Sequence, residues 1–220
     1  MKKICLAALI VGLPLGASAQ DPVKVDPGHY KVLVDNASVR VLKVTVAAGE
    51  KTPTHAHPDG IIVPLTGANA RFTLPDGKTR DAAMTSETPI YDPAGTHAGA
   101  NVGTNQLEAI LVEIKSKTAA AATLPTGRPG MAQTILAEGP LAIAYRSTAA
   151  PDFQEAAGST HDFDQVVIAL GPADIALSID GKPAKSKWQR GEVQFVGRGV
   201  KHESKNTGGK PVDFIIVGVK

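Results

Sequence analysis

Two stretches decide how this sequence is interpreted: GEKTPTHAHPDGIIVPLTG, residues 49–67, and PAGTHAGAN, residues 93–101. In the first, His55 and His57 stand two residues apart. On a β-strand, residues i and i+2 face the same side, so both imidazoles can point at one centre. In the second, His97 follows a Pro-x-Gly turn, and an antiparallel strand can return it opposite the pair. Three neutral imidazoles suit a divalent ion of Fe, Mn, Co, Ni, Cu or Zn.

The sequence around these stretches is typical of short strands separated by turns. Residues 39–46, VRVLKVTV, are rich in β-branched side chains, and residues 61–65 form a short apolar run suited to a buried strand. Residues 71–74 lead into Pro75-Asp76-Gly77, a hairpin signal because glycine accepts a positive φ. After the leader, no segment shows convincing helical periodicity. Short strands with turns between them predict an all-β sandwich or barrel.

The chain also repeats itself. Several markers recur at an almost constant offset of 104 to 105 residues: His57 as His161, Gly67 as Gly171, Asp76-Gly77-Lys78 as Asp180-Gly181-Lys182, His97 as His202, and Asn101 as Asn206. Each match alone is trivial, but a shared offset indicates two copies of one structural unit.

The markers resemble the two sequence motifs of the cupin family. The first motif is matched by Gly49, His55, His57 and Gly67. The second motif is matched by Pro93, Gly95, His97 and Asn101. Because the second unit carries the pattern too, the resemblance covers almost all of the chain after residue 19. It implies an all-β protein of two tandem double-stranded β-helix (jelly-roll) barrels. It also implies a pocket inside the barrel, with a metal, where present, in that pocket.

The first unit departs from the family pattern in two places. The family's usual fourth ligand is a Glu shortly after the His pair, but Gly60, Ile61 and Ile62 fill that region. None of them can bind metal through its side chain. Glu87 replaces the glycine that usually opens the second motif, and the sequence alone gives no reason to make it a ligand. We therefore predict a three-histidine site of His55, His57 and His97.

The second unit departs further. It keeps the second motif at Gly191, Gly197, Gly199, His202 and Asn206. Its first motif is broken, because Ser159 stands where the first histidine is expected and His161 where the second is. Asp164 or Gln165 lies near the acid position. We therefore predict a degenerate site that binds metal poorly or not at all.

The first residues predict export. A basic start at Lys2 and Lys3 precedes an apolar run and the small residues Ala17-Ser18-Ala19, as in a secretory signal peptide. The apolar run is shorter than the roughly 20 residues of a membrane-spanning helix. The predicted organisation is a signal peptide at 1–19, a first cupin domain at 20–118, a linker at 119–129 with the boundary near Leu124, and a second cupin domain at 130–220. The expected location is the periplasm or the extracellular space.

The charge and the cysteine content limit which partners the protein is expected to bind and which atoms can hold a metal. Without Lys2 and Lys3 the chain has 21 basic and 21 acidic residues. The charge therefore does not favour binding to nucleic acid or, after cleavage, to a membrane surface. Cys5, the single cysteine, leaves with the predicted leader, so a metal must be held by nitrogen and oxygen.

Two functions remain open. The first is a metal-dependent enzyme, oxygenase-like (most of all dioxygenase-like) or isomerase-like, acting on a small polar molecule. An anionic chelating substrate is favoured, because three neutral ligands leave the charge of the ion uncompensated. The second is a non-catalytic periplasmic protein that binds or senses a small molecule, since one fold hosts many functions. The sequence assigns no catalytic residue, and a homodimer stays open.

Overall fold

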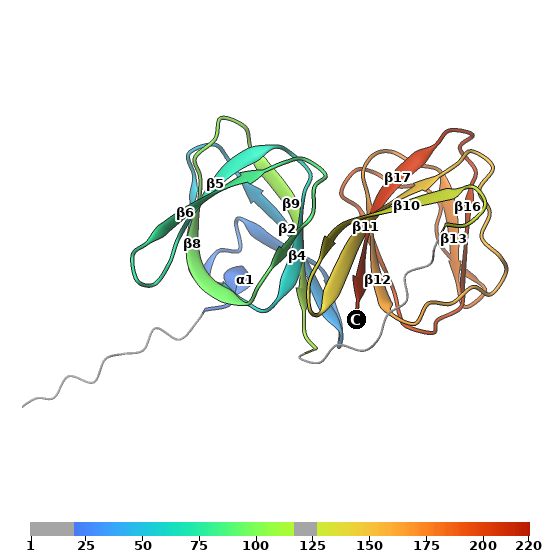
Figure 1. Cartoon of the computed structure of the whole chain (residues 1–220), viewed down its shortest axis with the longest axis horizontal. Coiled ribbons are helices and arrows are strands. Elements are labelled where there is room, and N and C mark those ends of the chain that lie inside the picture. Colours follow the sequence, from blue (N-terminus) through green and yellow to red (C-terminus); the bar gives the residue numbers. More distant parts are fainter. Residues whose placement is uncertain (1–19, 117–126) are drawn as a thin grey trace, which may run out of the picture.

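The computed structural model describes residues 20–116 and 127–220. In these residues the chain forms two β-barrels side by side (Figure 1). The predicted signal peptide, and most of the predicted linker with its boundary near Leu124, lie outside the described residues. The described part contains one short helix that the sequence analysis did not predict, α1 (Pro22–Val25), whose first turn is capped by the side chain of Asp21. It contains no helix with the length and apolar character needed to cross a membrane.

The first barrel consists of two sheets. Its strands are β1 (Tyr30–Asp35), β2 (Val39–Val46), β3 (Lys51–His57), β4 (Gly60–Pro64), β5 (Ala68–Thr73), β6 (Thr79–Met84), β7 (Ile90–Asp92), β8 (Gly95–Asn101) and β9 (Leu107–Ile114). One sheet has the order β1-β2-β9-β4-β7 and the other the order β3-β8-β5-β6. All the pairings are antiparallel.

The second barrel repeats this plan. Its strands are β10 (Met131–Glu138), β11 (Ala142–Ala149), β12 (Asp164–Ala169), β13 (Ile175–Ile179), β14 (Lys182–Lys185), β15 (Val193–Val196), β16 (His202–Asn206) and β17 (Val212–Val219). The orders β10-β11-β17-β12-β15 and β14-β13-β16 match those of the first barrel, except that β3 has no full counterpart. Isolated bridges from Gln154 and Ser159 to β16 take its place. The prediction of an all-β chain with two tandem barrels is confirmed.

The repeated Asp-Gly turns fall at equivalent points. Gly77, with φ 82°, lies in the β5–β6 turn, and Asp180 and Gly181, with φ 49° and 73°, lie in the β13–β14 turn. All three adopt the left-handed conformation that glycine tolerates best. The Asp-Gly pair therefore lies in a hairpin connection at the equivalent place in each barrel, although the connection is longer between β5 and β6 than between β13 and β14.

The barrels pack through a shared apolar core. On β2, Val39 and Val41 face this core, whereas Leu42, Val44 and Val46 face the interior of their own barrel. This is the period-two alternation of a strand that is buried on both faces. Strands β4 and β9 of the first barrel and β11, β12 and β17 of the second contribute to the same core. The two long sheets thus form the central layers of the molecule.

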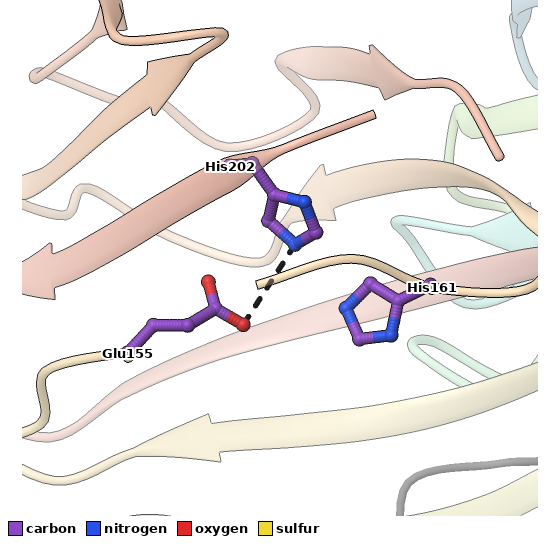
Figure 2. Close-up of side chains that lie close together, drawn as sticks. All are labelled: Glu155, His161 and His202. Atoms are coloured by element: carbon purple, nitrogen blue, oxygen red, sulfur yellow. Dashed lines mark ion pairs between the residues drawn. The ribbon is translucent and has the colours of Figure 1, made fainter. Parts of the chain in front are cut away.

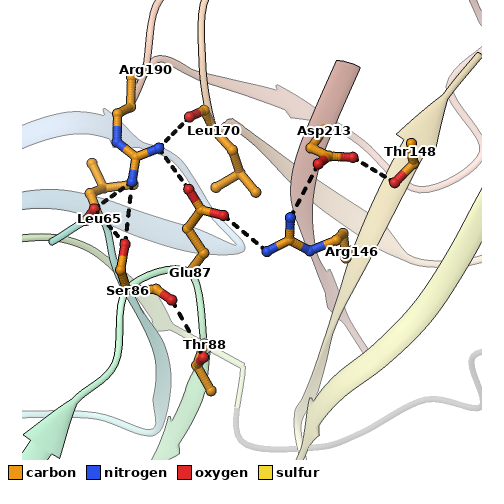
Figure 3. A network of polar contacts seen from close by, with 9 residues as sticks. All are labelled: Leu65, Ser86, Glu87, Thr88, Arg146, Thr148, Leu170, Arg190 and Asp213. Atoms are coloured by element: carbon orange, nitrogen blue, oxygen red, sulfur yellow. Dashed lines mark hydrogen bonds and ion pairs between the residues drawn. The ribbon is translucent and has the colours of Figure 1, made fainter. Parts of the chain in front are cut away.

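A network of hydrogen bonds and ion pairs connects the two barrels at one part of their junction (Figure 3). Glu87 accepts hydrogen bonds from Arg190 at 2.8 Å and from Arg146 at 3.0 Å, both in the second barrel. Arg190 also donates to the carbonyl oxygens of Leu65 and Leu170, one from each barrel. Burial opposes ionisation of Glu87, but the two arginines outweigh it and lower the pKa of the carboxyl. Glu87 thus joins the barrels and does not face either histidine cluster.

Candidate functional site

The first barrel brings the three predicted histidines together. His55 and His97 are directly opposite each other in the β3–β8 pair. Their ring centres lie 4.8 Å apart, and those of His57 and His97 lie 5.0 Å apart. The antiparallel return of β8 next to β3 produces this arrangement, as the motif spacing predicted. His55 and His57 are 3% and 7% exposed, so water reaches neither imidazole freely.

Backbone carbonyls fix the tautomers of the His pair. Nδ1 of His55 lies 2.9 Å from the carbonyl oxygen of Pro53, and Nδ1 of His57 lies 2.9 Å from that of Pro58. A carbonyl oxygen only accepts, so each Nδ1 carries the proton and each Nε2 carries a lone pair. Nε2 of His57 is buried and has no hydrogen-bond partner. Such outer contacts orient histidines that bind metals, and the unpaired nitrogen is a suitable donor to a cation.

One of the three ring spacings is wider than a shared ion requires. The ring centres of His55 and His57 are 6.4 Å apart, whereas imidazoles on neighbouring positions of one ion lie about 5 Å apart at normal bond lengths. Nε2 of His55 also lies 3.2 Å from the hydroxyl of Tyr30. Metal binding therefore requires the pair to close in and the Tyr30 contact to loosen.

Asp92 supplies a carboxylate that the sequence analysis missed. It ends β7 and is the cross-strand partner of Gly60 in β4. Its Oδ2 lies 3.5 Å from Nε2 of His57. Burial raises the pKa of Asp92. The positive charges of Arg80 and of a protonated His57 lower this pKa, but burial outweighs them. The expected acid is thus absent from the strand after the His pair but present on the strand beside it. Asp92 directly precedes the Pro-x-Gly turn that leads to His97, and this position could have marked it as a candidate site residue.

The cavity of the first barrel favours neutral imidazoles. It has a volume of about 60 Å³ and is lined by the three histidines, Asp92 and apolar side chains that include Phe72. Burial, followed by the neighbouring histidines, lowers the pKa of His97 to about 3. Burial also lowers the pKa of His55. Both imidazoles are therefore neutral at neutral pH, and each carries a lone pair on one ring nitrogen.

The second barrel holds a different cluster, formed by Glu155, His161 and His202 (Figure 2). One donor atom from each lies within 4.8 Å of the others, and in residues 20–116 and 127–220 this is the one group of three His, Cys, Asp or Glu side chains that are close enough to share an ion. Ser159 bridges to His202 as His55 pairs with His97, so it does occupy the position of the first histidine. Asp164 takes no part, because it accepts a hydrogen bond from the backbone of Arg198 at 2.7 Å.

Glu155 was missed because it precedes the eroded motif. It lies in the segment before Ser159, outside any motif spacing, and reaches the cluster only because that segment folds beside β16. Its Oε1 is 3.7 Å from Nε2 of His202. No local sequence signal marks it as part of a site.

The guanidinium of Arg128 lies against this second cluster. Its Nη1 forms a close ion pair with Oε1 of Glu155, and its Nη2 lies 3.3 Å from Nε2 of His161. Ser204 donates a hydrogen bond to the other oxygen of Glu155 at 2.9 Å. Burial, followed by His202 and Arg128, lowers the pKa of His161 to about 4. An internal cation thus already neutralises the only carboxylate of the cluster.

Comparisons with known proteins bear on the fold. No protein-family model and no curated protein sequence matches the chain. Among solved structures, the cupin 2 conserved barrel domain protein from Leptotrichia buccalis aligns with a TM-score of 0.57 and 13% identity, over 87% of this chain and 88% of that one. The chain has the cupin fold.

Two further solved structures are similar to most of the chain. AerE from Microcystis aeruginosa aligns with a TM-score of 0.70 and 11% identity, over 92% of this chain and 97% of that one. Salicylate 1,2-dioxygenase from Pseudoaminobacter salicylatoxidans, in a structure with gentisate adducts, aligns with a TM-score of 0.62 and 12% identity, over 84% of this chain and 70% of that one. At these identities the similarity establishes the cupin fold, and the function must be argued from the site.

Proposed function

We propose that this chain is an exported two-barrel cupin that holds one divalent transition-metal ion, of Fe, Mn, Ni, Cu or Zn, through His55, His57 and His97. The first barrel is then the centre of a metal-dependent enzyme, dioxygenase-like or isomerase-like. Its substrate is a small polar or anionic molecule, and no nucleic acid or membrane takes part. A homodimer is compatible with this function.

One observation carries the proposal. Nε2 of His57 is a buried nitrogen without a hydrogen-bond partner, while its Nδ1 is held by the carbonyl oxygen of Pro58. A buried polar atom without a partner costs about 1–3 kcal/mol, and a metal ion on the free lone pair removes this cost. His55 shows the same hydrogen bond from Nδ1, to Pro53, so both rings present the same nitrogen to the cavity.

The chemistry follows from the charges around the cavity. A bound ion supplies Lewis acidity and open coordination positions. The three imidazoles are neutral, so an anionic chelating group balances the ion better than a neutral one does. Asp92, with its raised pKa, is placed beside His57 to hold or accept a proton. Support for this substrate class comes from the salicylate dioxygenase of the same fold, whose structure contains gentisate adducts.

The test is the metal content per chain of purified wild type, His57→Ala and His161→Ala. Wild type should carry close to one ion per chain, His57→Ala should lose it, and His161→Ala should retain it, because Arg128 already neutralises the second cluster. If His161→Ala loses the metal and His57→Ala keeps it, the site lies in the other barrel. If wild type binds no divalent ion, the enzyme proposal fails.

A second function is favoured by the contact between Tyr30 and His55. Burial raises the pKa of Tyr30 to about 12, so its hydroxyl stays protonated and can donate to Nε2 of His55 at 3.2 Å. His55 thus has a partner without metal, as expected of a non-catalytic pocket that binds or senses a small molecule. Tyr30→Phe distinguishes the two functions. If the first barrel is a metal-dependent enzyme centre, the variant should bind metal more tightly than wild type. If it is a non-catalytic pocket, neither wild type nor the variant should bind metal.

A further inference from the structure

The second barrel places two polar side chains where the first barrel has none. Ser147 on β11 and Gln165 on β12 are 1% and 4% exposed, and Oγ of Ser147 and Nε2 of Gln165 have no hydrogen-bond partner. Their strand neighbours Ala144 and Val166 face the core shared by the barrels. Because side chains alternate along a strand, Ser147 and Gln165 face the interior of their own barrel.

The equivalent positions of the first barrel identify these polar groups as a local specialisation. Ser147 and Gln165 pair with Phe214 and Gly218 of β17. The residues paired with β9 at the corresponding places, opposite Ala109 and Glu113, are Val44 and Gly60. The second barrel thus gains a hydroxyl and an amide deep inside, whereas its metal-like cluster lies beside Arg128.

Both polar groups line a cavity of about 70 Å³. One water needs roughly 10–15 Å³ of such volume, so the space suits a single ring or a few waters. Phe153, Trp188 and Phe214 provide aromatic walls. Unpaired buried donors are uncommon and call for a partner, and aromatic walls favour a planar one.

The charge distribution selects a neutral ligand. Arg128 and Glu155 also border the cavity, but they form an ion pair with each other. The inner groups, Ser147 and Gln165, carry no charge. A ligand carboxylate placed beside them would lose its hydration without gaining a counter-ion, which is costly.

We propose that the second barrel binds a small neutral planar molecule, a single ring carrying a carbonyl or similar hydrogen-bond acceptor, without the help of a metal. Nε2 of Gln165 donates to that acceptor, Ser147 completes the hydrogen bonding, and Trp188 packs against the ring. This site is separate from the proposed metal centre in the first barrel.

Trp188 allows a direct test, because it is the single tryptophan of the chain. It lines the cavity, and its Nε1 donates to the carbonyl oxygen of Ile175 at 3.0 Å, so the indole is fixed in place. Titration of the full chain with benzamide should change the Trp188 fluorescence saturably. Benzoate and cyclohexanecarboxamide, which alter the charge and the planarity of the probe, should each bind about tenfold more weakly or worse.

Variants locate the binding. Gln165→Leu removes the donor at nearly constant volume and should weaken benzamide binding about tenfold, whereas the exposed control Gln106→Leu should leave it unchanged. Ser147→Ala, a smaller change, should weaken it as well if Gln165→Leu fails to fold. His57→Ala should have no effect, which separates this site from the metal centre. Absence of a saturable signal would mean that the cavity holds water alone. Equal binding by wild type and by both folded cavity variants would also overturn the proposal.

Discussion

Oδ2 of Asp92 lies 3.5 Å from Nε2 of His57, although the two residues come from strands in different sheets. The contact exists because β7 pairs with β4 and brings Asp92 opposite Gly60. A Cβ on Gly60 would lie 2.6 Å from the carbonyl oxygen of Val112. The backbone therefore leaves no room for an acidic side chain at position 60, and the carboxylate of the site comes from the neighbouring strand.

Asp92→Asn should weaken metal binding by the first barrel about tenfold or more, because its carboxylate lies beside the ring nitrogen that would bind the ion, where it can balance the positive charge or bind the ion itself. The measurement is competition for metal with a chelator of known affinity. Asp76→Asn, in an exposed turn, is the control and should match wild type. Equal metal affinity in Asp92→Asn and wild type would remove Asp92 from the centre.

Arg128→Met should turn the second cluster into a metal site. Without the guanidinium, Glu155, His161 and His202 present an uncompensated carboxylate and two imidazoles within 4.8 Å of one another. In a His57→Ala background, metal content should rise from near zero to about one ion per chain. Adding Glu155→Gln should abolish the gain, and Arg128→Lys should show little of it. A folded Arg128→Met protein without metal would show that Arg128 does not take the place of a cation.

Stability should fall in acid partly through His161. Its pKa in the folded chain is lowered from 6.5 to about 4 by burial, then by His202 and Arg128. Between these values the unfolded chain binds the proton and the folded chain does not, so stability is lost as the pH falls from 6.5 towards 4. His161→Gln should flatten the pH dependence of the unfolding free energy in this range.

His29 provides a control of opposite sign. Burial opposes its protonation, but hydrogen bonds with Glu50 and Asp26 outweigh this and raise its pKa. Its contribution to stability is therefore full below 6.5 and lost as the pH rises. His29→Gln should make the protein more sensitive to acid. A steeper acid loss in His161→Gln than in wild type would contradict the assignment.

Glu87→Gln should lower the free energy of unfolding by about 1 kcal/mol, because it weakens hydrogen bonds from two arginines of the other barrel. Thermal or urea unfolding measures the change. The control is Glu138→Gln. Glu138 forms an ion pair with Lys220, and its side chain is 56% exposed. The change in the free energy of unfolding should therefore stay within about 0.5 kcal/mol. Equal effects of the two changes would mean that the network at the junction adds nothing beyond an ordinary surface pair.

We expect the chain to be exported and cleaved so that it begins at or near Gln20, because Ala17 and Ala19 provide the small residues that signal cleavage needs. Mass spectrometry of periplasmic or secreted material measures the N-terminus. Ala19→Leu should slow processing and accumulate the longer form. Exported wild-type protein that still carries Met1 would rule out cleavage.

The sequence by itself determined the all-β class, several of the strands, the duplication and the shared strand face of His55 and His57. These are local properties. Alternation with period two shows which residues share a face, Asp-Gly pairs mark hairpins, and an i, i+2 pair such as His55 and His57 stays together in any strand. The offset between His97 and His202 identified the second unit without any knowledge of pairing.

Only the tertiary structure decided what surrounds these residues. The approach of Asp92 to His57 depends on which strand follows β4 in the sheet, and that of Arg128 to Glu155 depends on two loops meeting. The inward direction of Gln165 depends on the register of β12 against β17, because a slip of one residue would turn it to the other face. Long-range pairing and register have no local signal in a single sequence, and in this protein they determine the charge and the hydrogen bonding of both cavities.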